Sequence, residues 1–501
     1  MKNIWKKSTK SILIGMTAVT TLVIFSTNTR AETVNLDEQQ KQVAEVYNLK
    51  FNENNYTLQT LSKGDETVTY RAYENIVYVS NPVNLDYQIM NYYVPEAYYE
   101  GKSIANYSIQ TAPIFFPNQI GGYNPAKPAT IENESVYLAL AQGYVVASPG
   151  ARGRTTQNED GINTGKAPAA LVDLKAAVRY LRHNDTIMPG DAEKIVANGT
   201  SAGGALTALL GSTGNNKDYE PYLINIGAAN EYDDIFAVSS YCPITNLDNA
   251  DTAYEWLFNG VNAYKWRENG TLTEEQIKVS QELKVMFPSY LNSLELSIPQ
   301  NINSDILKAE TELTLDVNGN GTFKEYVKHF LLLSAQNALD NGEDLSSLSW
   351  ITIRDKKVTD IDLNRFVTYA TRMKTPPAFD SLDAKSYENS LFGTETIDNQ
   401  HFTKYSANYS TVEGSLADEL SIKMMNPMNY IEAKATTISQ HWRIRHGSID
   451  RDTSLAVPIM LATKLENNGY DVDFAIPWNI GHSGNYDLEE LFQWINEIST
   501  K

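Results

Sequence analysis

The chain has 501 residues, of which 42% are hydrophobic and 20% charged, a mixture typical of globular proteins that bury a large core. Its formal net charge of -20 at pH 7 makes nucleic acids and anionic membrane surfaces unfavourable partners. A single cysteine, Cys242, excludes an intrachain disulfide. The apolar residues before it indicate a buried strand residue rather than a nucleophile.

The first 31 residues have the pattern of an export signal. Four lysines precede an apolar stretch from about residue 12 to 25, and Thr29-Arg30-Ala31 presents small residues at the two positions that a signal peptidase reads. Three threonines interrupt this stretch, which is too short to span a membrane comfortably. We therefore expect cleavage after Ala31, a secreted extracellular protein, and no membrane association after cleavage.

The next part of the chain predicts antiparallel strands followed by alternating strands and helices. Residues 68–93 are rich in Tyr, Val and Ile, which favours antiparallel strands. Short apolar strands are then predicted at 113–116, 144–147, 194–197 and 234–241, with helices at 134–142, 167–182 and 202–210. Such an alternation predicts a parallel sheet flanked by helices.

The alternation stops at about residue 243 and resumes at residue 439. The sequence between is mostly helical and polar, and two further strands (439–445, 472–476) and helices (454–467, 488–498) follow it. We therefore predict one α/β core domain formed by residues 32–242 and 430–501. A large, mainly helical lid domain, residues 243–429, is inserted between them.

The segment Gly199-Thr200-Ser201-Ala202-Gly203 matches G-x-S-x-G. The pattern alone is weak, and a plain glycine-rich turn is the alternative. Its context is specific, because it lies between a buried strand and a helix of small residues, where the nucleophile elbow of an α/β-hydrolase belongs. Flanking glycines permit the sharp turn, and the helix N-terminus favours developing negative charge. Ser201 is therefore the predicted nucleophile.

A serine nucleophile needs a base and an acid, which in this fold follow it in the order acid, then histidine. His482 is the one of six histidines in the loop after the final strand, so we predict that it is the base. Asp450 and Asp452 both follow the strand at 439–445, and we assign Asp450 to orient His482. A helix cap or a salt bridge with Arg451 is the alternative for either carboxylate.

An oxyanion hole needs two backbone donors. Ala202, directly after the nucleophile, provides one, and the loop after the early strand provides the other, which we assign to Gly122. A plain turn is the alternative for this glycine.

The segment that starts at Asp316 resembles the beginning of a calcium loop, with Asn318 and Asn320 at the next ligand positions. The acid expected at the twelfth position is missing, because Val327 stands there and Glu325 comes two positions early. We therefore expect a structural turn and assign no metal site, with adventitious calcium binding as the alternative.

Over nearly all of its mature part, the sequence resembles the bacterial tannases (tannin acyl hydrolases). The stretches that carry this resemblance are 117–118 with 121–123, 198–204, 240–244, 372–374, 388–393, 441–447 and 482–488. Together they are far more specific than G-x-S-x-G.

The resemblance implies an esterase that cleaves the bond between gallic acid and an alcohol, sugar or catechin, without a cofactor. By motif, Ser201, Asp450 and His482 correspond to the triad, and Gly122 and Ala202 to the oxyanion hole. In this family a lysine, a glutamate and an aspartate bind the gallate hydroxyls, and these residues match Lys374, Glu388 and Asp452. Ile244 matches an apolar wall against the ring. Tyr387 departs from the pattern, because a relative can carry proline there.

Two other functions remain as alternatives. A feruloyl esterase or an oligopeptidase-like serine hydrolase can share the elbow and the late Asp and His. A non-catalytic binding protein with a hydrolase fold is disfavoured because all three triad positions are filled.

Overall fold

The computed structural model describes residues 47–64, 66–266, 268–302 and 307–500. The expected signal peptide, residues 1–31, lies outside the described residues. Within the described part, none of the helices has the length and apolar character needed to cross a membrane.

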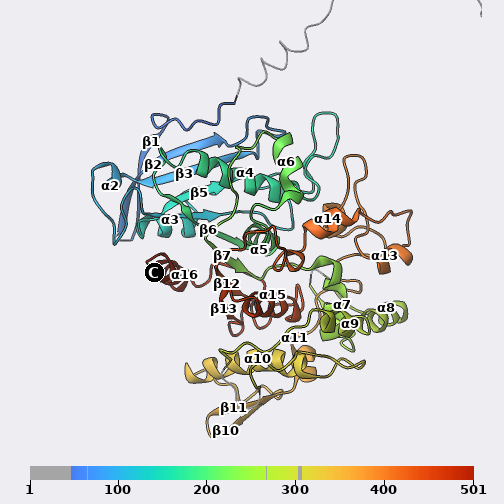
Figure 1. Cartoon of the computed structure of the whole chain (residues 1–501). Helices are drawn as coiled ribbons and strands as arrows, with labels where there is room; N and C mark the ends of the chain where they lie inside the picture. Colours follow the sequence, from blue (N-terminus) through green and yellow to red (C-terminus); the bar gives the residue numbers. More distant parts are fainter. Residues whose placement is uncertain (1–46, 65, 267, 303–306, 501) are drawn as a thin grey trace, which may run out of the picture. The chain divides into compact units, whose positions relative to one another are not determined.

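The described chain is built around a nine-stranded sheet with the order β1-β2-β3-β5-β4-β6-β7-β12-β13 (Figure 1). The pairs from β1 to β5 are antiparallel, and all pairs from β5 to β13 are parallel. The strands are β1 (Thr57–Lys63), β2 (Glu66–Val77), β3 (Ile89–Pro95), β4 (Pro113–Pro117), β5 (Val145–Pro149), β6 (Asp191–Thr200), β7 (Ala237–Tyr241), β12 (His441–Arg445) and β13 (Asp471–Ala475). This is the mostly parallel sheet that the sequence predicts.

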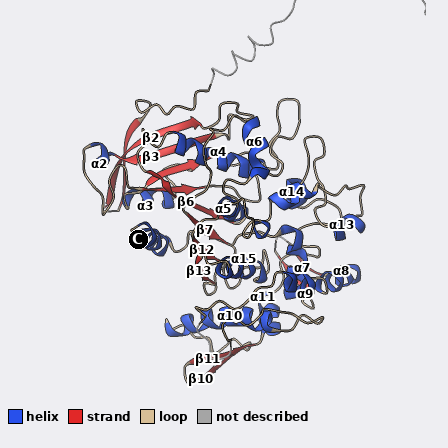
Figure 2. Ribbon diagram, in the orientation of Figure 1, coloured by secondary structure: helices blue, strands red, loops and turns tan. Residues whose placement is uncertain are grey.

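Helices cover both faces of this sheet, with α3 and α16 on one face and α4, α5 and α15 on the other (Figure 2). All residues of β4, β5 and β7 are buried, as expected for parallel strands that are covered on both sides. The helices around the sheet are α2 (Glu96–Tyr99), α3 (Glu134–Ala141), α4 (Ala169–His183), α5 (Ala202–Ser212), η1 (Lys217–Tyr219), α6 (Glu220–Asn225), α15 (Ala456–Asn467) and α16 (Leu488–Ser499).

Helix α5 lies unusually close to the sheet because glycines face the strands. A Cβ on Gly204 would come within 2.5 Å of the Tyr241 carbonyl oxygen, and one on Gly211 within 2.2 Å of a Val238 methyl group. These contacts fix the start of α5, and therefore Ser201, against the ends of β6 and β7.

The inserted segment, residues 243–429, is mainly helical, as predicted, but it also contains two small hairpins that the sequence analysis did not predict. Their strands are short and largely solvent-facing, so they lack the apolar runs of the main sheet. The elements are α7 (Leu247–Phe258), β8 (Ala263–Lys265), β9 (Asn269–Thr271), α8 (Glu274–Lys284), α9 (Phe287–Ser293), α10 (Thr322–Asp340), β10 (Ile351–Arg354), β11 (Lys357–Ile361), α11 (Leu363–Ala370), α12 (Tyr387–Leu391), α13 (Lys404–Asn408), α14 (Glu419–Met424) and η2 (Pro427–Asn429).

Strands β7 and β12 pair directly, from Ala237 with His441 to Tyr241 with Arg445, although the whole inserted segment separates them in sequence. The loops that follow β4, β6, β7, β12 and β13 therefore all leave the same carboxyl edge of the parallel strands. This edge is where open α/β sheets bind ligands.

Candidate active site

Ser201 stands at a strained turn between β6 and α5. Its φ and ψ angles are 61° and -125°, a conformation that residues with a side chain rarely adopt. The turn depends on its glycines, because a Cβ on Gly199 would lie 2.4 Å from the Gly203 carbonyl oxygen. The backbone thus holds the hydroxyl of Ser201 out from the sheet, as in a nucleophile elbow.

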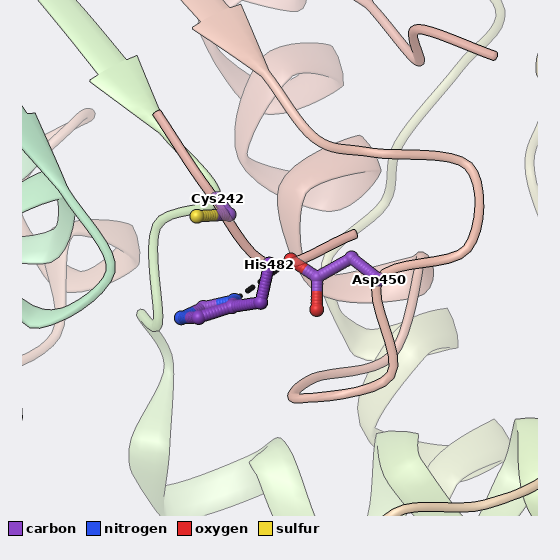
Figure 3. Close-up of side chains that lie close together, drawn as sticks. All are labelled: Cys242, Asp450 and His482. Atoms are coloured by element: carbon purple, nitrogen blue, oxygen red, sulfur yellow. Dashed lines mark hydrogen bonds and ion pairs between the residues drawn. The ribbon is translucent and has the colours of Figure 1, made fainter. Parts of the chain in front are cut away.

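The structure places His482 between Ser201 and Asp450. Its Nε2 lies 2.8 Å from Ser201 Oγ. Its Nδ1 lies 2.8 Å from Asp450 Oδ2 (Figure 3). The backbone amide of Asp452 donates to the other oxygen of Asp450, at 2.8 Å. Asp450 is therefore the carboxylate that orients the imidazole, and Asp452 points elsewhere.

The electrostatics of this pair stabilise the positive charge that the His482 imidazole gains when it takes up a proton beside a carboxylate. Burial opposes ionisation of Asp450, but the imidazoles of His446 and His482 and the Asp452 amide hold the pKa of its carboxyl below the ordinary value. Burial likewise opposes a charged His482 and is the largest single contribution, but the interactions with Asp450 and Cys242 together outweigh it and raise the pKa of the imidazole. His446 is buried behind Asp450, with Nδ1 3.8 Å from Oδ2.

Cys242 lies directly after β7 rather than within it, and it is fully buried, as predicted. Its thiol donates to the Ser483 carbonyl oxygen at 3.4 Å, and burial raises the pKa of the thiol. Among the described residues, the one group of three potential metal ligands is Cys242 with Asp450 and His482 (Figure 3). Asp450 and His482, two of these three, are already hydrogen-bonded to each other.

The loop after β4 brings Gly122 to the same site. Asn118 anchors this loop, because its side chain donates to the Gly203 carbonyl at 3.2 Å and to Thr207 Oγ1 at 2.9 Å. Gly122 has a φ of +54°, in the left-handed region that favours glycine. Ala202 is the first residue of α5, so its amide has no acceptor within the helix. Both predicted oxyanion donors therefore lie at the Ser201 turn or on the loop beside it.

Arg154 holds the Gly122 loop, and the sequence analysis did not predict this residue. Its Nε donates to the Gly122 carbonyl oxygen at 2.8 Å, and its guanidinium lies 4.3 Å from the centre of the Tyr387 ring. The Tyr387 ring in turn lies 3.3 Å from where a Cβ on Gly122 would stand. The tyrosine that departs from the family pattern therefore forms a wall of the site beside Gly122.

The predicted ring-binding residues line the same cavity as Tyr387. Lys374 Nζ lies 3.2 Å from Asp452 Oδ2 and 3.8 Å from the centre of the Phe379 ring. Glu388, the second residue of α12, is 8% exposed. Burial raises the pKa of its carboxyl, although the charge of Lys374 works in the opposite direction.

Helix α7 fixes the backbone of Lys374. The Tyr254 hydroxyl accepts hydrogen bonds from the amides of Met373 and Lys374, at 3.0 and 3.1 Å. Arg372 Nε donates to the Lys374 carbonyl oxygen at 2.8 Å, and Arg372 forms a fully buried ion pair with Glu255. The sequence analysis did not predict this support, because Arg372 and Glu255 are more than a hundred residues apart in the chain.

One cavity of about 620 Å³ brings these groups together. Seven of the nine predicted site residues line it, namely Gly122, Ser201, Ile244, Lys374, Glu388, Asp452 and His482. The other two, Asp450 and Ala202, are buried directly behind the lining. A larger cavity of about 690 Å³ lies among α7, α9, α13 and α14 and contains none of the nine.

The calcium-like segment forms a local turn, as expected. Asp316 Oδ1 accepts from the amides of Asn318 and Asn320, at 2.8 and 3.0 Å. The Gly319 carbonyl oxygen accepts from the indole of Trp256 at 3.0 Å, which ties the turn to α7.

Comparisons with known proteins agree with this geometry. A family model described as BD-FAE, an α/β-hydrolase family, matches residues 122–292. A comparison with curated proteins gave no match. Among solved structures, the tannase of Fusobacterium nucleatum is 50% identical, with a TM-score of 0.85, over 90% of this chain and 100% of that one.

A tannase from Lactobacillus plantarum is 43% identical, with a TM-score of 0.86, over 90% of this chain and 99% of that one. A tannin acyl hydrolase solved in complex with ethyl gallate is 45% identical, with a TM-score of 0.85 and the same coverage. These relatives support an ester-hydrolysing enzyme. With such identity over nine tenths of its length, the chain belongs to the tannase (tannin acyl hydrolase) family and has an α/β-hydrolase fold.

Proposed function

We propose that this chain is a secreted serine esterase that hydrolyses galloyl esters, including tannins and alkyl gallates, to gallic acid and an alcohol. The observation that carries the proposal is the single cavity that Ser201 and His482 share with Lys374, Glu388 and Asp452. Related structures described as complexes with ethyl gallate and with 3,4-dihydroxybenzoate support a phenolic acyl group in such a cavity.

The proposed reaction begins with attack on the ester carbonyl. Ser201 Oγ gives its proton to His482 Nε2, 2.8 Å away, as it attacks the carbonyl carbon. Asp450 holds the imidazole with Nδ1 protonated and stabilises the positive charge that develops. The amides of Gly122 and Ala202 stabilise the negative charge on the carbonyl oxygen.

The tetrahedral intermediate then collapses to an acyl-enzyme. His482 gives its proton to the departing alcohol oxygen, which leaves the galloyl group esterified to Ser201. Water enters, loses a proton to His482 and attacks the same carbonyl, and gallic acid is released. These steps need only the described side chains, the two amides and water.

Recognition of the ring uses groups of matched hydrogen-bonding character. Phenolic hydroxyls donate to the carboxylates of Glu388 and Asp452, and the Lys374 ammonium donates to a phenol oxygen. Ile244, which is 4% exposed, forms an apolar wall against the ring. An ester that lacks the hydroxyls leaves the buried Glu388 carboxylate and the Lys374–Asp452 ion pair without the hydrogen bonds that the hydroxyls supply, so the cavity disfavours it.

Secretion is part of the proposal, and it is supported by the charge and apolar pattern of residues 1–31. N-terminal sequencing of the protein from culture medium tests it. The expected mature N-terminus is Glu32, and retention of the chain inside cells with Met1 intact would overturn it.

The decisive assay for the activity compares purified wild-type protein on methyl gallate, methyl ferulate, methyl benzoate and an amino-acyl anilide. We expect methyl gallate to have the highest kcat/KM, at least about a hundredfold above methyl benzoate, because only the gallate supplies hydroxyls that bind Glu388 and the Lys374–Asp452 pair. A preference for ferulate would indicate a feruloyl esterase, and a preference for the anilide an oligopeptidase-like enzyme. Failure to react with a fluorophosphonate would indicate a binding protein.

A further inference from the structure

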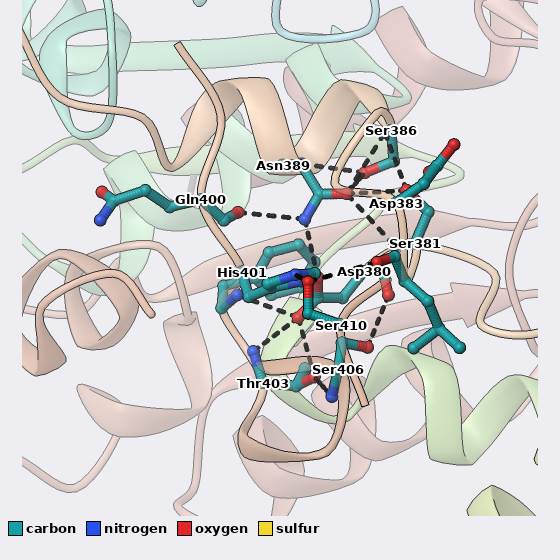
Figure 4. Close-up of polar contacts among 12 residues, drawn as sticks. Asp380, Ser381, Asp383, Ser386, Asn389, Gln400, His401, Thr403, Ser406 and Ser410 are labelled. Atoms are coloured by element: carbon teal, nitrogen blue, oxygen red, sulfur yellow. Dashed lines mark hydrogen bonds and ion pairs between the residues drawn. The ribbon is translucent and has the colours of Figure 1, made fainter. Parts of the chain in front are cut away.

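The inserted segment contains a buried polar cluster centred on Asp380 (Figure 4). The Asp380 carboxylate is fully buried and accepts hydrogen bonds from five donors. Asn389 Nδ2 and His401 Nδ1 each lie 2.7 Å from Oδ1. The amides of Phe402 and Thr403 and the Thr403 hydroxyl lie 2.7 to 2.9 Å from Oδ2. Such complete pairing makes Asp380 a rigid centre for the segments around it.

This cluster contains a second serine–histidine–aspartate chain. His401 Nδ1 contacts Asp380, and His401 Nε2 lies 2.8 Å from Ser410 Oγ. The Ser410 hydroxyl also lies 2.8 Å from the Val412 carbonyl oxygen, which can only accept a hydrogen bond. The Ser410 hydroxyl has a single proton, so the Val412 carbonyl oxygen competes for it with His401 Nε2. This competition favours a structural role for the cluster over a nucleophilic one.

Asn389 joins the cluster to the helix that carries Glu388. Its Nδ2 donates to Asp380 at 2.7 Å and to the Gln400 carbonyl oxygen at 3.0 Å. Its Oδ1 accepts from the hydroxyls of Ser381 and Ser386, at 3.0 and 2.7 Å. Ser386 is the N-cap of α12, so the start of this short helix is tied through Asn389 to Asp380.

The position of Glu388 depends on this tie. Helix α12 has only five residues, too few to be stable without tertiary contacts. Glu388 is adjacent to Asn389, and its side chain lines the cavity that contains Ser201. We infer that Asp380, His401 and Asn389 are positioning residues. They hold the Glu388 side chain in the cavity where it can accept a hydrogen bond from a ring hydroxyl. This inference rests on the proposed function, because it assigns Glu388 to substrate recognition.

The test uses Asn389→Ala, which removes the side-chain hydrogen bonds of Asn389 with Asp380 and Ser386. It leaves Ser201, His482 and Asp450 unchanged. We expect the ratio of kcat/KM for methyl gallate over methyl benzoate to fall roughly tenfold, mainly through a higher KM for the gallate. The rate on methyl benzoate should stay near that of the wild type. An equal loss on both esters, or no loss on either, would overturn the positioning role.

A double-mutant cycle separates positioning from general loss of structure. In a Glu388→Gln background, Asn389→Ala should change the gallate-to-benzoate ratio less than twofold, because residues that act through one group are not additive. Independent effects of the two substitutions would contradict the inference.

Ser410→Ala provides a second test if Asn389→Ala does not fold, because Ser410 lies at the partly exposed end of the cluster. It should lower the gallate-to-benzoate ratio about twofold to threefold.

A crystal structure of the Asn389→Ala variant tests the positioning of Glu388 independently of whether the enzyme prefers gallate esters. If the wild-type enzyme shows no preference for gallate, the proposed function fails, and the structure of the variant still tests the positioning. A displaced Glu388 carboxylate is expected, and one that is unmoved relative to Lys374 and Asp452 would overturn the inference.

Discussion

His482 and Ser201 are separated by 281 positions in the chain, yet His482 Nε2 lies 2.8 Å from Ser201 Oγ. The contact exists because the turn after β6 and the loop after β13 leave the same edge of one parallel sheet. Four strands from two distant parts of the chain, β6, β7, β12 and β13, must pair in register for the two side chains to meet.

Ser201→Ala should lower kcat on methyl gallate by about four orders of magnitude or more, because the variant has no group that can form the acyl-enzyme. Rates on methyl gallate and labelling by a fluorophosphonate provide the measurements. The wild type should be labelled once, at Ser201, and the variant should remain unlabelled with an unchanged melting temperature. Labelling of the variant at Ser410 would mean that the second serine–histidine–aspartate chain is reactive.

Asp450→Asn and Asp452→Asn form a matched pair two positions apart. Asp450 contacts Nδ1 of His482, so its amide replacement favours the wrong tautomer and should lower kcat on every ester by about 10⁴. Asp452 contacts Lys374 instead, so Asp452→Asn should lower activity on methyl gallate and spare methyl benzoate. Steady-state kinetics on both esters check this, and equal losses in the two variants would contradict the assignment.

The preference for gallate should weaken at acid pH. Because burial raises the pKa of Glu388 above its ordinary value of 4.5, its carboxylate is lost at a higher pH than that of a free glutamate. A protonated Glu388 accepts a phenolic hydrogen bond less strongly, so KM for methyl gallate should rise as pH falls through that raised pKa. KM values for gallate and benzoate between pH 4 and 8 provide the test.

Glu388→Gln is the control for this pH effect, because an amide does not titrate in this range. The variant should show a uniformly high KM for methyl gallate, with a flat dependence on pH. A KM that still rises toward acid pH in Glu388→Gln would assign the titration to another group.

Gly203→Ala should destabilise the elbow. A Cβ there would lie 2.5 Å from Asn118 Oδ1 and 2.6 Å from the Ile120 carbonyl oxygen, both on the loop that carries Gly122. Such overpacking should lower the free energy of unfolding by about 1–3 kcal/mol. It should also lower kcat, because it moves the loop that carries Gly122. Gly121→Ala is the control, since no atom lies within 4 Å of the added Cβ. Denaturant unfolding of the two variants measures the difference.

The sequence by itself determined the parts of this protein that depend on local pattern. Alternating apolar strands and helices predicted the parallel sheet, and the turn between β6 and α5 identified Ser201. Chain order then identified His482, because a single histidine follows the last strand. The family resemblance added Lys374, Glu388, Asp452 and Ile244, and the cavity in which the structure places them makes that assignment geometrically consistent.

Tertiary structure alone decided which side chains support that site. These supporting contacts are hydrogen bonds between segments that are far apart in the chain or in loops, so no repeating sequence pattern indicates them. They join Arg154 to Gly122, Tyr254 to the Lys374 backbone, and Asn389 to Asp380. The sequence favoured Asp450 over Asp452 without excluding either, because both follow the same strand. The folded loop places Asp450 against His482 and Asp452 against Lys374. A hydrogen bond depends on distances of a few ångströms between folded segments, and those distances are set by packing rather than by spacing along the chain.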